Sequence, residues 1–415
     1  MLKIYFTDSR ALERLSSGPA NPHLDGFADF LYTQGYAWTT ARRYLRAAAH
    51  LGQWVDTVNI SIVDLSEKAL SSFARHLKRC RCNRSSVDKS SDAIVGARHF
   101  FNHLIRLGVV PVQNDEYLQC THKPLCEGFL RWMRQHRGVT ERTLEIYGPT
   151  VIDVLDTLGD DPSRYQIENL RRFVFDQLKQ SGTGKAKTTV KALRMFLRYL
   201  IAEGLCLSDL HEGIPRLADW RLSNLPRYLP STDVEQIIDA CDSSTPTGRR
   251  DRAILLLLAR LGLRGGDVAG LQIDDIDWIE ASIRFSGKGH REVRLPLTQE
   301  VGDAILQYLQ DGRPTVSDDH LFIRAKAPLR RLNSGSTVSR IVARAIRKAG
   351  VDTPSYGAHV LRHSAATAML CQGVSLNGIA AVLRHRSIET TVHYAKVNIA
   401  LLKEVAQPWP EVDPC

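Results

Sequence analysis

The sequence lacks a long apolar run and a leader-like start. No apolar stretch approaches the roughly 18 to 20 residues that a membrane-spanning helix needs. The opening segment, MLKIYFTDSRALERL, carries acidic residues and has neither the apolar core nor the cleavage site of a signal peptide. We therefore expect a protein that stays in the cytoplasm and has no membrane partner.

The sequence also lacks a regular cysteine pattern. Its eight cysteines are scattered, and in a large chain without a secretion signal we expect reduced thiols. The residues from which a metal site could be assembled are His76, Cys80, Cys82, Cys120, His122 and Cys126. Their spacing fits none of the usual zinc patterns, so we favour ordinary thiols in or beside helices and expect no metal site.

Acidic residues are outnumbered by basic ones. The chain has 45 Asp and Glu against 55 Lys and Arg, which gives a formal net charge of +10. An excess of this size favours a polyanionic partner, although by itself it does not separate DNA from RNA or from an anionic membrane. The length of 415 residues suits two or three domains.

Two stretches within the first 210 residues look like copies of one helical unit. Apolar residues recur at spacings of three, four and seven through both stretches, which is the pattern of amphipathic helices. Gly108 and Gly204 stand after the last helix of each copy, where a C-terminal helix cap belongs. We predict an N-terminal helical domain over 1–115 and a second helical domain over 120–210.

The remainder of the chain interrupts this helical pattern once. Residues 211–229 contain Pro215 and Pro226, with Pro230 directly after them, and are typical of a linker into a third domain, 230–415. Two short strand-like segments, 277–285 and 292–296, predict a β-hairpin with Lys288 near its tip, and helical spacing resumes after it. The third domain should therefore be mostly α with one small antiparallel sheet.

Two segments gather basic residues without an acidic one between them. The first, a helix expected within 179–198, includes Lys185, Lys187, Lys191 and Arg194. The second, within 323–350, includes Arg330, Arg331 and Arg340. The ordinary alternative is that the first segment is a solvated helix face whose charge is balanced by a neighbouring acidic surface. However, backbone amides at its glycine-containing start are suited to binding phosphate. We favour DNA contact, with the two basic segments forming a clamp around a duplex.

Six residues of the third domain follow one another in an order that indicates a catalytic site. They are Arg264, Lys288, His359, Arg362, His385 and Tyr394. Taken singly, each has an ordinary interpretation, such as a structural ion pair for Arg264 or a solvated turn residue for Lys288. Together they resemble the tyrosine recombinase (phage integrase) family, in which an Arg, a hairpin Lys, a His-x-x-Arg motif, a His and a Tyr follow one another. The resemblance covers the whole third domain, and the segment from His385 to Tyr394 is its most specific part.

The resemblance implies a fold and a reaction. The fold is mainly α: two helical, SAM-like DNA-binding units, the second resembling the family's core-binding domain, precede a mostly α catalytic domain. Tyr394 would attack a DNA phosphodiester and store its energy as a 3′-phosphotyrosine. Arg264 and Arg362 would bind the scissile phosphate, a task that suits planar guanidinium groups. No metal or nucleotide cofactor is then expected.

The resemblance also assigns roles to the remaining residues. Lys288 would give a proton to the leaving 5′ oxygen. His359 would help to deprotonate Tyr394 or hold the phosphate, and His385 would donate a hydrogen bond to a nonbridging oxygen. The sequence departs from the family twice: Asp267 stands where Glu is common, and Arg384 replaces Gly in the usual Leu-Gly-His. Neither departure removes a proposed catalytic residue, and we expect Asp267 to brace Arg264 or a backbone turn.

The family acts on double-stranded DNA as four protomers on two sites, which implies a homo-oligomer or an assembly with related recombinases. An amphipathic helix expected over 397–405 would dock on the next protomer. The extra N-terminal unit is similar to the larger recombinases of bacterial mobile elements, so integration or transposition is the expected role. The alternatives are a type IB topoisomerase that relaxes DNA as a monomer, or a non-catalytic DNA-binding accessory subunit.

Overall fold

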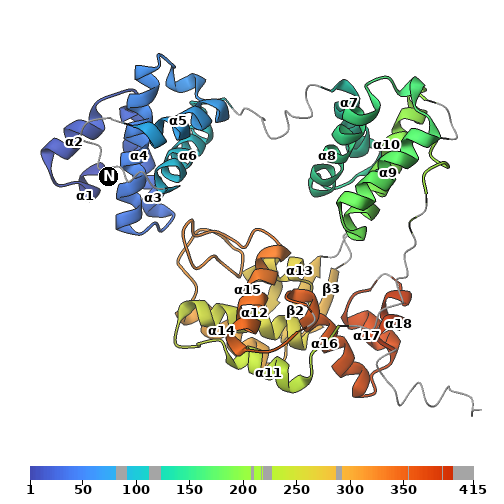
Figure 1. The fold of residues 1–415 in the computed structure, drawn as a ribbon. Helices are drawn as coiled ribbons and strands as arrows, with labels where there is room; N and C mark the ends of the chain where they lie inside the picture. The colour runs from blue at the N-terminus through green and yellow to red at the C-terminus, as the bar shows by residue number, and fades with distance from the viewer. Residues whose placement is uncertain are drawn as a thin grey trace, which may run out of the picture. The chain divides into compact units, whose positions relative to one another are not determined.

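The computed structural model describes residues 1–80, 91–111, 123–206, 210–215, 217, 227–286, 292–353, 355–385 and 387–395 (Figure 1). Over these residues the chain is mainly helical and includes a three-stranded antiparallel sheet, so the predicted fold class is confirmed. No helix of the described part is long and apolar enough to cross a membrane.

Contacts between Cα atoms group the chain into two compact units. One contains Met1–Ser61, Leu77–His103 and Arg221–Cys415, and the other contains Ile62–His76 and Leu104–Trp220. The boundaries pass through helices α5 (Glu67–Arg79) and α6 (Ser91–Arg106), each of which is one continuous helix. The domain limits predicted from the sequence remain a prediction.

The first 206 residues repeat one order of elements. After two short helices, α1 (Leu2–Tyr5) and α2 (Ser9–Ser16), the first copy comprises α3 (Asn21–Thr33), α4 (Trp38–Thr57), η1 (Ile62–Asp64), α5 and α6. The second copy comprises α7 (Pro124–Arg137), α8 (Glu141–Leu158), η2 (Pro162–Arg164), α9 (Ile167–Gln180) and α10 (Thr183–Ala202). Gly108 and Gly204 have φ values of 71° and 70°, the left-handed conformation that ends a helix and favours glycine. The matching order supports the predicted duplication.

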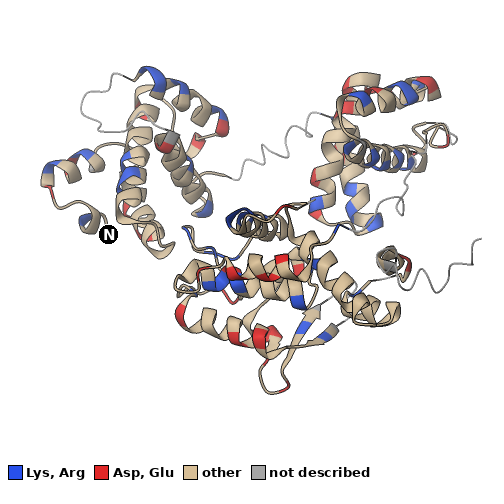
Figure 2. Cartoon of the chain, turned by 60° about the horizontal axis from the view of Figure 1, so that its bottom comes forward, with Lys and Arg blue, Asp and Glu red and all other residues tan. Residues whose placement is uncertain are grey.

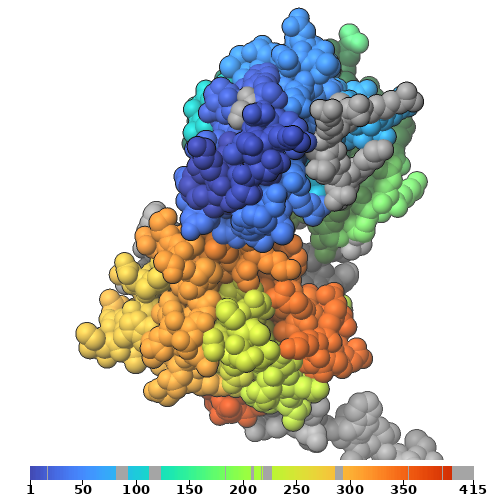
Figure 3. Space-filling model, turned by 90° about the vertical axis from the view of Figure 1, so that its left-hand side faces the viewer, coloured from blue at the N-terminus to red at the C-terminus, as the bar shows by residue number. Residues whose placement is uncertain are grey.

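Most of the C-terminal elements pack around one large hydrophobic core. They are α11 (Ser231–Asp239), α12 (Pro246–Arg260), α13 (Gly265–Gly270), η3 (Ile273–Asp275), β1 (Ile276–Asp277), β2 (Ser282–Ser286), β3 (Glu292–Pro296), α14 (Gln299–Asp311), α15 (Gly335–Ala349), α16 (Ala358–Cys371), α17 (Leu376–Val382) and α18 (Glu389–Ala395). Residues Ala253–Ala259 of α12 are all buried, as their unbroken apolar run predicts, and α12 packs against both α14 and α16. In the space-filling view these elements, yellow to red, form a closely packed body (Figure 3).

The sheet differs from the prediction in one respect. The segment expected as one strand over 277–285 is divided into β1 and β2, which pair antiparallel with Ile276 opposite Ile283. The Asp277 carboxylate accepts hydrogen bonds from the backbone N–H groups of Ile279 and Glu280, and Ala281 has a φ of 44°. A side chain that bonds the following backbone in this way stabilises a turn instead of a ladder. The expected strand over 292–296 is confirmed as β3, while Lys288 lies outside the described residues.

Candidate active site

Tyr394 lies on α18 and is buried, with only 3% of its surface exposed. It belongs to a small core with Ala366 and Leu370 of α16, Ile379 of α17 and Leu383. Three consecutive helices therefore fix the position of the phenol ring. Burial raises the pKa of the Tyr394 hydroxyl, while the positive charges of Arg362 and Arg264 act to lower it.

The Tyr394 hydroxyl has a histidine partner that the sequence analysis did not single out. His363 Nδ1 lies 2.8 Å from Tyr394 Oη, within hydrogen-bond distance. His363 is half-buried, and burial, aided by the charges of His359, His393 and Arg362, lowers its pKa to about 4. The imidazole is therefore neutral at physiological pH, and its Nδ1 accepts the phenolic hydrogen bond in the tautomer that carries the ring proton on Nε2. The signal in the sequence was its position directly after the His-x-x-Arg motif.

His385 lies between α17 and α18, beside the same phenol. Its Nδ1 is 2.7 Å from Thr391 Oγ1, and its ring is nearly parallel to that of Tyr394, with centroids 6.4 Å apart. Burial and the charges of Arg362 and Arg264 lower the pKa of His385 to about 4. Thr391 is completely buried, so it holds the imidazole in a defined orientation.

Arg362 is buried on α16 and bonded to backbone carbonyls. Its guanidinium donates to Gly262 O and, over 2.6 Å, to Leu383 O. Burial, with the charge of Arg264, lowers the pKa of Arg362 to about 10, so it remains charged at physiological pH. Two of its five N–H groups thus join the segment after α12 to the end of α17.

Arg264 precedes α13 and is more accessible, with 43% of its side chain exposed. Its backbone N–H donates to the Asp267 carboxylate over 3.3 Å, and its Nη1 lies 4.0 Å from the same carboxylate, so Asp267 contacts both the backbone and the side chain of Arg264. The Arg264 guanidinium also donates to Arg384 O over 3.1 Å. These contacts direct Arg264 toward the turn that carries His385.

Arg384 occupies a conformation that favours glycine, since its φ is 53°. Its guanidinium forms an ion pair with Asp267 and lies over the Phe285 ring, 4.5 Å from the centroid. The Arg384 side chain thus contacts both α13 and β2.

A pocket of about 470 Å³ opens beside Tyr394, and its lining includes His363, His385, Glu389 and Thr390. His359 lies on the exposed surface of the first turn of α16, with its ring centroid 6.5 Å from that of His363. The structure thus brings together Arg264, Arg362, His385 and Tyr394 and adds His363. Within the described residues, no group with metal-ligand spacing lines this pocket.

The basic residues predicted to bind DNA fall into two kinds. Lys185 and Lys191 are exposed on α10, whereas Arg194 is half-buried and donates to the carbonyls of Ile214 and Pro215 over 3.1 and 3.4 Å. Lys187 lies half-buried on the same helix. Figure 2 shows Lys and Arg residues in blue on the helices of this region. Arg194 therefore has a structural role in fixing residues 214–215.

The predicted basic residues near α15 are all exposed. They are Arg330, Arg331 and Arg340. Arg331 Nη1 is 3.1 Å from His320 Nε2, and Arg340 donates to Thr337. The pKa of the neighbouring Arg324 is lowered by burial and by the charges of Arg330 and Arg340, so several cations lie close together here.

Comparison with known proteins gives matches over the whole chain. The description "Phage integrase family" matches residues 227–400. The "Putative integrase/recombinase y4rA" of Sinorhizobium fredii is 33% identical over 418 residues, which cover 99% of each chain. The tyrosine recombinase XerC of Thermodesulfovibrio yellowstonii is 29% identical over 67% of this chain and 93% of its own.

Solved structures share the fold. The XerH site-specific recombinase bound to palindromic difH substrate superposes with a TM-score of 0.55 at 19% identity, over 72% of this chain and 90% of that one. A lambda integrase dimer bound to a core site gives a TM-score of 0.53 at 19% identity, over 70% and 98% of the two chains.

Proposed function

Because the chain belongs to the tyrosine recombinase (phage integrase) family, we propose that Tyr394 cuts and rejoins DNA strands at specific sites. The observation that carries this proposal is the setting of the Tyr394 hydroxyl. It is bonded to a neutral imidazole, and two guanidinium groups act on it electrostatically. Phosphoryl transfer to a tyrosine requires a base beside the nucleophile and cationic groups that bind the anionic phosphate.

The reaction proceeds by exchange of one phosphodiester for another. Tyr394 Oη attacks the phosphorus, the bond from phosphorus to the 5′ oxygen breaks, and the phenolic proton passes to His363. The products are a 3′-phosphotyrosine and a 5′ hydroxyl, which completes its O–H with a proton from the enzyme. The reverse attack by a 5′ hydroxyl of the partner strand restores Tyr394 and joins the strands.

Arg264 and Arg362 bind the nonbridging oxygens, on which negative charge increases in the transition state. The accessible Arg264 meets the phosphate first, and Arg362 presents its remaining N–H groups from a fixed position. His385, held by Thr391, donates a hydrogen bond to a nonbridging oxygen. By the family resemblance, Lys288 supplies the proton to the 5′ oxygen and His359 contacts the phosphate.

The partners follow from the same family. The chain binds double-stranded DNA and assembles with further copies, as a tetramer on two sites or with related recombinases. Its length and its similarity over 99% of the chain to an integrase/recombinase favour integration or transposition of a bacterial mobile element, performed in the cytoplasm. The duplicated helical unit extends the protein surface available to flanking DNA.

The test uses nicked duplexes that carry the ends of the DNA element surrounding the gene. Cleavage close to the nick releases a short strand and traps the covalent intermediate. Wild-type protein should form a 3′ adduct that migrates slowly in a denaturing gel, and Tyr394→Phe should form none. An adduct that persists in Tyr394→Phe overturns the assignment of the nucleophile. Relaxation of any supercoiled plasmid without recombination between two sites would instead identify a topoisomerase.

A further inference from the structure

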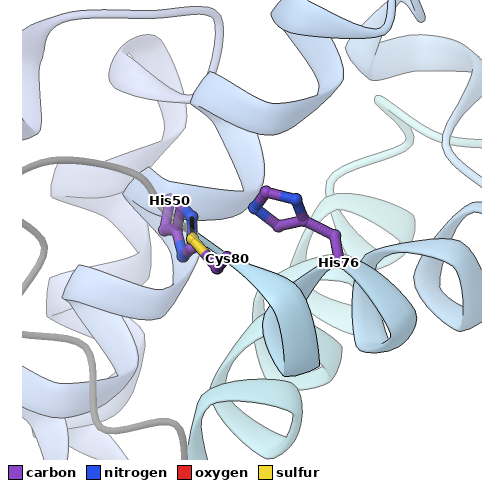
Figure 4. A group of neighbouring side chains, drawn as sticks. All are labelled: His50, His76 and Cys80. Atoms are coloured by element: carbon purple, nitrogen blue, oxygen red, sulfur yellow. Dashed lines mark hydrogen bonds between the residues drawn. The ribbon is translucent and has the colours of Figure 1, made fainter.

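Three potential metal ligands meet where α5 ends, although the cysteine spacing gave no reason to expect a site. They are His50 of α4, His76 of α5 and Cys80, the residue that directly follows α5 (Figure 4). Their nitrogen and sulfur atoms all lie within 4.8 Å of one another. We propose that these three side chains bind a zinc ion.

The geometry suits zinc. Zn–N bonds of about 2.0 Å and Zn–S bonds of about 2.3 Å at tetrahedral angles place a nitrogen and a sulfur ligand roughly 3.5 Å apart. His50 Nε2 and Cys80 Sγ are separated by 3.6 Å. His76 and Cys80 are four residues apart at the end of one helix, so the turn of the helix brings them to the same side. Binding therefore requires only a small inward movement of His76.

The chemistry of the ligands also favours zinc. Two imidazoles and one thiolate form a mixed nitrogen and sulfur set, which selects Zn²⁺ over the oxygen-seeking Mg²⁺ and Ca²⁺. His50 is only 3% exposed, and the other two side chains are half-buried, so the ion is largely shielded from water. The site lies just beyond the C-terminal end of α5, where the negative end of the helix dipole attracts a cation. On binding, the Cys80 thiol loses its proton, and a fourth tetrahedral position is left for a further donor or water.

The ion would fasten the end of α5 to α4. Because the unfolded chain does not hold these ligands together, zinc binding stabilises this part of the fold. Of the residues considered from the sequence alone, Cys126 is not part of the group, since its thiol is buried in α7 and lies 3.9 Å from Gly148 O. Cys82, Cys120 and His122 lie outside the described residues.

The experiment uses the full-length protein, stripped with a chelator under reducing conditions and titrated with zinc chloride. Elemental analysis after dialysis should find about one zinc per wild-type chain, and the chain should melt at a higher temperature with zinc than without. Cys80→Ser and His76→Ala should each weaken zinc binding by more than the roughly 10- to 100-fold that loss of an outer-shell partner costs. The control is Cys371→Ser, which removes an exposed thiol at the end of α16 and should bind zinc as the wild type does.

Cobalt replaces zinc as a spectroscopic probe of the same site. Co²⁺ bound by Cys80 should give a sulfur-to-cobalt charge-transfer band, which Cys80→Ser removes and His76→Ala weakens. Far-ultraviolet circular dichroism verifies that both variants fold, since neither residue is fully buried. Equal zinc content in wild type and in the double variant His76→Ala/Cys80→Ser, or no zinc in a folded wild-type chain, overturns the proposal.

Discussion

Arg384 and Asp267 form an ion pair, and they occupy the two positions at which the sequence departs from the family pattern. The Arg384 side chain is only 9% exposed, and its φ of 53° carries the strain of a non-glycine residue in the left-handed region. Asp267 also accepts the backbone N–H of Arg264. The two departures are therefore coupled: the shorter acid and the added guanidinium together hold the turn before His385.

This coupling predicts non-additive stabilities. Asp267→Ala should lower the free energy of unfolding by about 1–3 kcal/mol, because it leaves a nearly buried Arg384 without its carboxylate. In an Arg384→Gly background the same substitution should cost less, with an interaction energy of about 0.5–3 kcal/mol in a double-mutant cycle. Urea denaturation of the four proteins measures this, and strictly additive values would show that the pair contributes nothing.

His363 is expected to matter more for cleavage than its neighbour His359. His363→Ala removes the hydrogen-bond acceptor of the Tyr394 hydroxyl and should slow the first cleavage step by about 10²-fold or more. His359→Ala should have a smaller effect, since this residue lies on the surface and its ring faces that of His363. Single-turnover cleavage of nicked duplexes compares the two variants. The reverse ranking would return the role of base to His359.

The lowered pKa values of His363 and His385 predict a dependence of stability on pH. Both pKa values are about 4 in the folded chain against an ordinary 6.5, so between these limits the unfolded chain binds protons that the folded chain does not. The free energy of unfolding should therefore fall as the pH drops from about 6.5 toward 4, and this contribution should be constant above that range. His363→Gln should flatten the profile.

Much of this site could be predicted from the order of residues along the chain. Arg264, Arg362, His385 and Tyr394 are brought together by α12 to α18 as their sequence pattern implies. The partner of the Tyr394 hydroxyl could not be predicted, because whether His359 or His363 faces α18 depends on how α16 is rotated. Likewise, the break between β1 and β2 depends on the Asp277 side chain, which competes with the strand for the backbone. The proximity of His50 to Cys80 joins residues 30 positions apart through the tertiary fold, which no spacing along the chain reveals.

Substitution of either active-site arginine should abolish cleavage, but only one of the two substitutions should strongly destabilise the fold. Arg362→Ala removes the guanidinium that bonds the carbonyls of Gly262 and Leu383, and it should destabilise the fold by about 2–4 kcal/mol as well as abolish cleavage. Arg264→Ala should abolish cleavage while changing the free energy of unfolding by less than about 1 kcal/mol, because 43% of the side chain is exposed. Thermal unfolding and covalent-adduct assays on both variants provide the comparison. A folded but weakly destabilised Arg362→Ala would show that its carbonyl contacts are dispensable.

The exposed lysines of α10 and the bonded Arg194 should likewise behave differently. Lys185→Ala and Lys191→Ala each remove an exposed positive charge and should weaken DNA binding to specific and unrelated duplexes alike, since an interaction with phosphate carries no sequence information. Each substitution that removes a lysine from a DNA phosphate should reduce the slope of log affinity against log salt by about 0.9. Arg194→Ala should instead lower the unfolding temperature, because its guanidinium bonds the carbonyls of Ile214 and Pro215. Fluorescence anisotropy at several salt concentrations measures the slope, with Arg142→Ala, an exposed arginine of α8, as the control. If Lys185→Ala/Lys191→Ala binds with the wild-type slope, α10 does not contact the DNA backbone through these lysines.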